Sequence, residues 1–151
     1  YLAWYYIGRI RAEQKGPQAK KLSIEAFQNS LKERPDFTDS VLSLSALYQD
    51  YNEDKKAIET LEQYQVENGP SGRVAEALAQ IYIEKEDYDR AIIQLQNIEK
   101  AGEGSLNTRM KMALLLIELK KLPEAITQLE DILQEAPDSD KVRFYLAAVY
   151  E

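Results

Sequence analysis

The chain has 151 residues, of which 44% are hydrophobic and 30% charged, so it can bury a core and is not disordered by composition. It contains no cysteine and no histidine, which excludes disulfides, thiolate nucleophiles, Cys-rich zinc sites and imidazole acid–base chemistry. The net charge of −7 argues against a nucleic-acid partner, because phosphate backbones are bound by excess Lys and Arg.

No apolar run reaches the roughly 18 residues that a membrane span needs, so we expect no segment that inserts directly into a membrane. The sequence begins without Met and ends inside an apolar helical pattern, which predicts a piece of a longer protein. Neither feature decides the compartment, and both a cytoplasmic and a bacterial periplasmic location stay open.

Taken in chain order, the sequence alternates between helix-like stretches and short breaks. Apolar residues spaced by three and four place one face of each stretch against a core. The first helices of successive hairpins are predicted near 2–15, 38–50, 72–84, 106–119 and 140–151. The second helices are predicted near 18–34, 54–67, 88–100 and 122–135. The hairpins are separated by breakers, which are Pro35, Gly69-Pro70, Gly102 with Gly104, and Pro137.

Two motifs recur along the chain at a step of 34 residues. In the first motif, a Leu or Met stands three residues after the starting residue and is followed directly by a small residue. The motif begins at Val41, Ala75, Arg109 and Arg143. The second begins at Ala57, Ala91 and Ala125. An earlier copy of the first motif begins at Trp4, 37 residues before Val41. Recurrence at one step in two independent motifs indicates a stack of helical hairpins, each too small to bury its apolar face alone.

Small residues stand at matched positions of the two helices. The first helices have Gly8, Ser45, Ala79, Ala113 and Ala147, and the second helices have Ser23, Ala57, Ala91 and Ala125. We expect them to let the paired helices approach closely while larger neighbours pack toward the next hairpin.

These residues resemble the tetratricopeptide repeat family, whose 34-residue helix–turn–helix unit opens with W-x2-L-G-x2-Y and closes with Pro. Trp4, Ile7 and Gly8 follow the opening, and Pro35 and Pro137 occupy the closing position. Arg11 and Arg109 depart from the pattern. The resemblance implies an all-α, right-handed superhelical α-solenoid forming one domain over 1–151. Its repeats would be about 1–37, 38–71, 72–105 and 106–139, with a partial fifth at 140–151.

In this family the first helices line a concave surface, and fixed positions on them face the ligand. Carried onto this chain, those positions include Ala12, Glu13, Ser43 and Asp50. The predicted peptide-binding groove consists of Tyr5, Arg9, Leu42, Ala46, Gln49, Arg73, Glu76, Gln80, Asn107, Met110, Leu114, Lys141 and Phe144. Its apolar spots and charges of both signs are typical of a surface for an extended or amphipathic peptide.

The resemblance therefore implies a non-catalytic scaffold that binds a segment of a partner protein. The alternative is a substrate-recruiting or regulatory arm of an enzyme whose catalytic domain lies elsewhere. Acidic pairs such as Glu53-Asp54, Glu86-Asp87 and Glu130-Asp131 lie in predicted turns or on outer faces, where solvated charge is ordinary.

We predict no catalytic residues, no metal and no cofactor, because no phosphate-binding loop, nucleophile elbow or metal-ligand spacing occurs. The helix at 140–151 has no second helix of its own. Its apolar edge predicts a homodimer formed through this helix.

Overall fold

The computed structural model describes residues 1–150, and every regular element within them is an α-helix. Nine helices follow one another in this range: α1 (Leu2–Glu13), α2 (Pro17–Glu33), α3 (Thr38–Asp50), α4 (Asp54–Asn68), α5 (Gly72–Glu84), α6 (Tyr88–Lys100), α7 (Leu106–Glu118), α8 (Leu122–Glu135) and α9 (Asp140–Tyr150). The expected first and second helices are thus all present, within two residues at each end. The predicted helical state of residue 151 lies outside the described residues.

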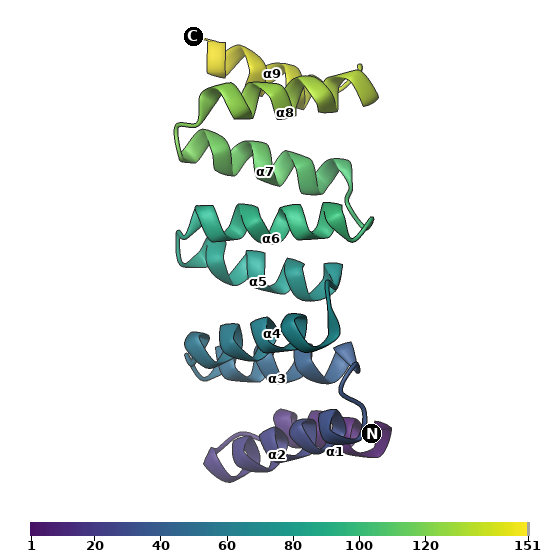
Figure 1. Ribbon diagram of the computed structural model, residues 1–151. Helices are drawn as coiled ribbons and strands as arrows, with labels where there is room; N and C mark the ends of the chain where they lie inside the picture. The colour runs from purple at the N-terminus through teal and green to yellow at the C-terminus, as the bar shows by residue number, and fades with distance from the viewer. Residues whose placement is uncertain (151) are drawn as a thin grey trace. The chain divides into compact units, whose positions relative to one another are not determined.

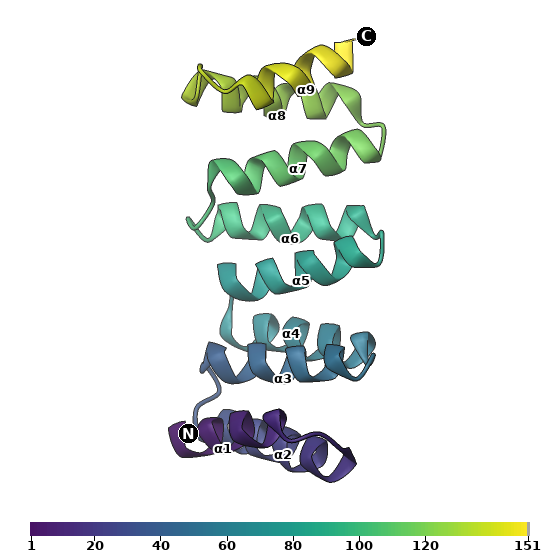
Figure 2. The same cartoon turned by 180° about the vertical axis from the view of Figure 1, so that it is seen from behind.

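The chain forms two compact units that divide within α5. Unit 1 spans Tyr1–Leu78, and unit 2 begins at Ala79. Within each unit, consecutive helices lie antiparallel and follow one another in chain order (Figures 1 and 2). The fold is therefore the all-α, helical-hairpin repeat that the 34-residue step predicts. The expectation of one continuous domain stays a prediction.

Each hairpin is closed by contact between its two helices at the small residues. Gly8 of α1 lies against the ring of Phe27 in α2, so closely that a Cβ at position 8 would come within 2.6 Å of a ring carbon. Beside this contact the Ser23 hydroxyl donates a hydrogen bond of 2.8 Å to the Gly8 carbonyl oxygen. The later counterparts Ala57, Ala91 and Ala125 are fully buried. Small residues therefore set the helix separation, as expected.

Successive hairpins join through larger apolar residues. In unit 1, Val41 and Leu44 of α3 are buried, as are Phe27 of α2 and Leu61 of α4. In unit 2, one core cluster connects α7, α8 and α9, and it consists of Met110, Ala113, Leu129, Ile132, Val142 and Leu146. Ala147 is exposed because no described helix follows α9 to cover it.

The turn inside each later hairpin uses a left-handed residue that is not glycine. Asn52, Glu86 and Lys120 have φ of 58°, 57° and 57°, and they are 34 residues apart. The amide of the following residue reaches back to the last turn of the first helix, as in the 2.8 Å bond from Glu53 N to the Tyr48 carbonyl. The recurrence of one turn conformation explains why the hairpins are alike although their turn sequences differ.

Gly8→Ala tests the close approach in the first hairpin. The added methyl group would meet the Phe27 ring, so we expect a loss of about 1–3 kcal/mol in the free energy of unfolding. Urea denaturation measures this loss. The double variant Gly8→Ala/Phe27→Leu should recover part of it, because the smaller side chain makes room. Two single-variant losses that simply add would contradict the proposed contact.

Candidate functional site

Most of the predicted groove residues of unit 1 belong to the first helices α1 and α3, and we call the surface that these two helices form the first-helix face. Arg9 and Ala46 are exposed there and line a shared hollow of about 280 Å³. The hollow also contains four more positions that the family resemblance marks as ligand-facing, which are Ala12, Glu13, Ser43 and Asp50. Part of the predicted surface in unit 1 is thus brought together around one shallow site.

An aromatic cluster lies beside the hollow. The Tyr5 ring packs edge-on against Phe37, with centroids 5.3 Å apart, and it also lies 6.2 Å from Phe27. The Arg9 guanidinium carbon is 5.8 Å from the centre of the Tyr5 ring, a weak cation–π contact. Tyr5 is half-buried as a result, and it holds Arg9 at the rim of the hollow.

The other predicted residues of unit 1 do not join this hollow. Leu42 and Gln49 of α3 are half-buried, whereas Arg73 and Glu76 of α5 are exposed. Arg73 forms an ion pair with Asp39, with a nitrogen–oxygen distance of 2.7 Å.

In unit 2 the predicted residues differ in exposure. Asn107, Lys141 and Phe144 are exposed, and so is Gln80, whose amide donates to Glu84 at 2.8 Å. Met110 is buried within the core cluster, and Leu114 packs partly buried against the same cluster. Met110 therefore contributes to the core and not to the surface.

A larger cleft lies in unit 2, and the sequence did not predict it. It has a volume of about 860 Å³, with walls from α6 and α8 and a floor from α7, and we call it the α6–α8 cleft. It is lined by Asp89, Ile92, Ile93, Gln96, Glu99 and Lys100, by Arg109, Met112 and Leu116, and by Lys121, Glu124, Gln128 and Asp131. Arg109, which departs from the family pattern, forms part of its floor and was the signal in the sequence that could have indicated the cleft.

Ion pairs close both ends of this cleft. Lys121 pairs with Asp89 at 2.6 Å, and the Arg109 guanidinium holds both carboxylate oxygens of Glu135 at 2.5 and 2.7 Å. Hydrogen bonding to Glu135 raises the pKa of Arg109, although burial opposes the rise, and the charges of Glu99 and Asp131 add to it.

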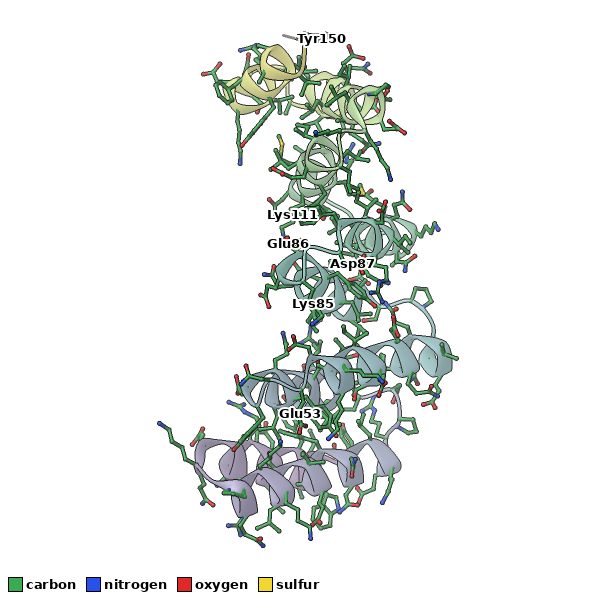
Figure 3. All side chains as sticks on the ribbon, turned by 90° about the vertical axis from the view of Figure 1, so that its left-hand side faces the viewer. Glu53, Lys85, Glu86, Asp87, Lys111 and Tyr150 are labelled. Atoms are coloured by element: carbon green, nitrogen blue, oxygen red, sulfur yellow. The ribbon has the colours of Figure 1, made fainter. Side chains whose placement is uncertain are left out.

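One carboxylate of each acidic pair considered for catalysis, namely Glu53, Asp87 and Glu130, has a side-chain partner. Glu53 binds Lys20 at 3.0 Å and Lys56 at 3.2 Å, at the point where the two hairpins of unit 1 meet (Figure 3). Asp87 caps α6 by accepting from the Arg90 amide, and it also accepts from the Arg90 side chain at 2.7 Å. Hydrogen bonding to Arg90 lowers the pKa of Asp87. These carboxylates hold turns and helix ends in place.

Two negative findings concern metal binding and membrane crossing. Among residues 1–150, no group of three or more Asp and Glu side chains is arranged to hold a metal ion. Over the same residues, no helix combines the length and the apolar character that crossing a membrane requires.

The fold and its surfaces define a helical-hairpin repeat protein, and comparison with known proteins specifies the family. The family described as anaphase-promoting complex, cyclosome, subunit 3 matches residues 50–132, more than half of the chain. The chain therefore belongs to this family, which is of the tetratricopeptide repeat type. Among curated proteins, no sequence matches the chain.

Solved structures show the same fold. A crystal structure of MamA protein superposes with a TM-score of 0.71 at 19% identity, covering 99% of this chain and 80% of that one. A second form, MamA AMB-1, gives 0.69 at 21% identity with the same coverage. A tetratricopeptide repeat protein from Parabacteroides merdae gives 0.64 at 18% identity, covering 97% of this chain and 56% of that one.

The pKa of Glu53 tests the ion pairs that join the hairpins of unit 1. Hydrogen bonds from Lys20, and secondarily from Lys56, lower this pKa below its ordinary value. The stabilisation that Glu53 provides is therefore complete above the pKa of the unfolded chain and is lost as pH falls through the lower folded value. We expect Lys20→Met to raise the Glu53 pKa in an NMR titration of the side-chain carboxyl carbon. Lys55→Met, which removes a neighbouring lysine that pairs with Glu59, should leave it unchanged.

Proposed function

We propose that this chain is a non-catalytic scaffold that binds a segment of a partner protein on its first-helix face. The observation that carries the proposal is the hollow between α1 and α3, where an arginine, two carboxylates and small side chains converge. The side chains that line the hollow are suited to binding those of an extended or amphipathic peptide. The charges of Arg9, Glu13 and Asp50 would fix the register of that peptide. The family to which the chain belongs is described as a subunit of a complex, which supports a role in assembly.

The remaining groove residues extend the same proposal. Leu42 and Gln49 lie on α3 beside the hollow, and Arg73 and Glu76 continue the row of first helices on α5. In unit 2, Gln80, Asn107, Lys141 and Phe144 are the exposed positions of the predicted groove. We infer that the chain provides recognition and not chemistry, because Glu53 and Asp87, two of the side chains considered as acid–base candidates, serve as an ion-pair partner and a helix cap.

Affinity capture tests the scaffold role. The intact protein, immobilised and exposed to an extract of its native cells, should retain a defined set of proteins that mass spectrometry identifies. Ala46→Trp fills the hollow with an indole ring, so we expect it to reduce retention of the specific partner at least about tenfold, the effect of losing a central contact.

Val66→Trp is the matched control, because Val66 is 81% exposed on α4 and lies outside the hollow. Equal thermal unfolding midpoints for the two variants would show that both remain folded. Retention of the same proteins at the same level by Ala46→Trp and Val66→Trp would contradict binding at this face.

Self-association is the second part of the proposal. Phe144 and Tyr150 of α9 are 68% and 64% exposed, and Ala147 and Ala148 beside them are exposed as well. This apolar edge lies where a further helix would pack in a longer stack. We propose that α9 of a second copy of the chain packs against it. Tyr150 also donates to Glu130 of α8 at 2.9 Å, which holds one end of the edge against the preceding helix.

Sedimentation velocity tests this edge. We expect the wild-type chain to show a concentration-dependent monomer–dimer equilibrium that Phe144→Glu shifts to monomer, because a buried unpaired carboxylate is costly. Val66→Glu introduces the same charge at a similarly exposed position of α4 and should leave the equilibrium unchanged. A wild-type mass that stays monomeric over a wide concentration range would contradict the dimer.

A further inference from the structure

Unit 1 contains a hollow at the equivalent repeat position, and comparing it with the α6–α8 cleft shows which side chains helix packing requires. This hollow of about 270 Å³ lies between α2 and α4 over α3, and most of its lining residues, among them Leu31, Val41 and Tyr48, stand 68 residues, or two repeat steps, before lining residues of the α6–α8 cleft. There the floor consists of Val41, Leu44 and Tyr48. Apolar side chains are therefore sufficient to stack these helices.

Unit 2 replaces part of this apolar lining with smaller or charged side chains. Leu116 stands at the position of Tyr48, so the cleft loses an aromatic ring and becomes roomier. Arg109 stands at the position of Val41, and Glu99 at the position of Leu31. Because stacking does not need these changes, they point to a ligand.

The two walls of the cleft differ in their apolar content. The α6 wall presents Ile92 and Ile93 among polar and charged side chains, and the Ile93 side chain remains 51% exposed. The α8 wall presents only the polar or charged Glu124, Gln128 and Asp131. The lining therefore favours an occupant that has both an apolar and a polar face.

The charge that remains after internal pairing is negative. Lys121 is neutralised by Asp89, and Arg109 by Glu135. The cleft lining also contains the carboxylates of Glu99, Glu124 and Asp131, against which stand Lys100 and the charge of Arg109, which Glu135 already pairs. One Glu99 carboxylate oxygen is shielded from solvent without a donor. Since a buried acceptor without a donor is unfavourable, the cleft favours an occupant that supplies cations and N–H groups.

We propose that the α6–α8 cleft is a second docking site, for a basic amphipathic helix of a partner protein. Its apolar side chains contact Ile92, Ile93 and Met112, and its Lys or Arg residues pair with Glu124 and Asp131. These two carboxylates are seven residues apart on α8, about 10.5 Å along the helix axis, so the partner helix carries two cations at the same separation. The site is independent of the function proposed for the first-helix face.

The test uses a synthetic peptide of about 18 residues, long enough to form a helix, with leucines on one face and two arginines seven residues apart beside them. A matched peptide has glutamate in place of both arginines. Fluorescence anisotropy of labelled peptides measures binding to the intact chain. We expect the basic peptide to bind, the acidic one to bind at least about tenfold more weakly, and the difference to vanish near 1 M salt, where charges are screened beyond about 3 Å.

Variants of the chain locate the site. Ile93→Glu and the double variant Glu124→Lys/Asp131→Lys should each weaken binding of the basic peptide at least about tenfold, and the double variant should now favour the acidic peptide. Val66→Glu and Asp138→Lys make the same chemical changes at exposed positions outside the cleft and should change affinity less than about twofold. Circular dichroism and unfolding midpoints establish that the variants are folded.

Three results would overturn the proposal. They are the absence of binding by the basic peptide, equal binding of both peptides at low salt, and affinity that the cleft variants leave unchanged. If instead Ile93→Glu abolishes self-association of the chain in sedimentation, the occupant is a second copy and the assignment to a partner is wrong. Each of these outcomes leaves the capture experiment with Ala46→Trp unaffected, so the two sites are tested separately.

Discussion

The close approach of two helices at paired small residues is the contact on which each hairpin depends. Gly8 lies so close to Phe27 that no larger side chain fits there, and the alanines Ala57, Ala91 and Ala125 are fully buried at the equivalent positions of the later second helices. This spacing directs the larger residues outward, toward the helices before and after. Each hairpin is thereby left with an apolar face that only a neighbouring hairpin can bury, and stacking in chain order is the consequence.

Stacking also produces surfaces that are lined by different side chains. The first helices α1 and α3 present small, polar and basic side chains around a shallow hollow, whereas α6 and α8 enclose a deeper cleft over α7. The replacement of an aromatic ring by Leu116 shows how one position in a repeat can create space for a ligand while the hairpin is retained.

The sequence was sufficient to predict the helices and their order, because the 34-residue step repeats both the apolar spacing and the small residues. Burial of Met110 could not be read from position rules, since it depends on how α9 covers α7 and α8 in unit 2. The left-handed turns at Glu86 and Lys120 were missed because neither residue is glycine. The α6–α8 cleft was missed because it combines three helices, although Arg109 was already a visible departure from the family pattern.

Hydrogen exchange followed by mass spectrometry tests most directly whether each helix is held only by its neighbours in the chain. Leu61→Ala creates a cavity at a fully buried position of α4 and should cost about 2–5 kcal/mol locally. We expect faster amide exchange in α3 and α4 and unchanged exchange in α8 and α9, since nearest-neighbour contacts confine the loss of stability to the helices beside the cavity. An equal loss of protection in all helices would show a single shared core and would contradict stacking in series.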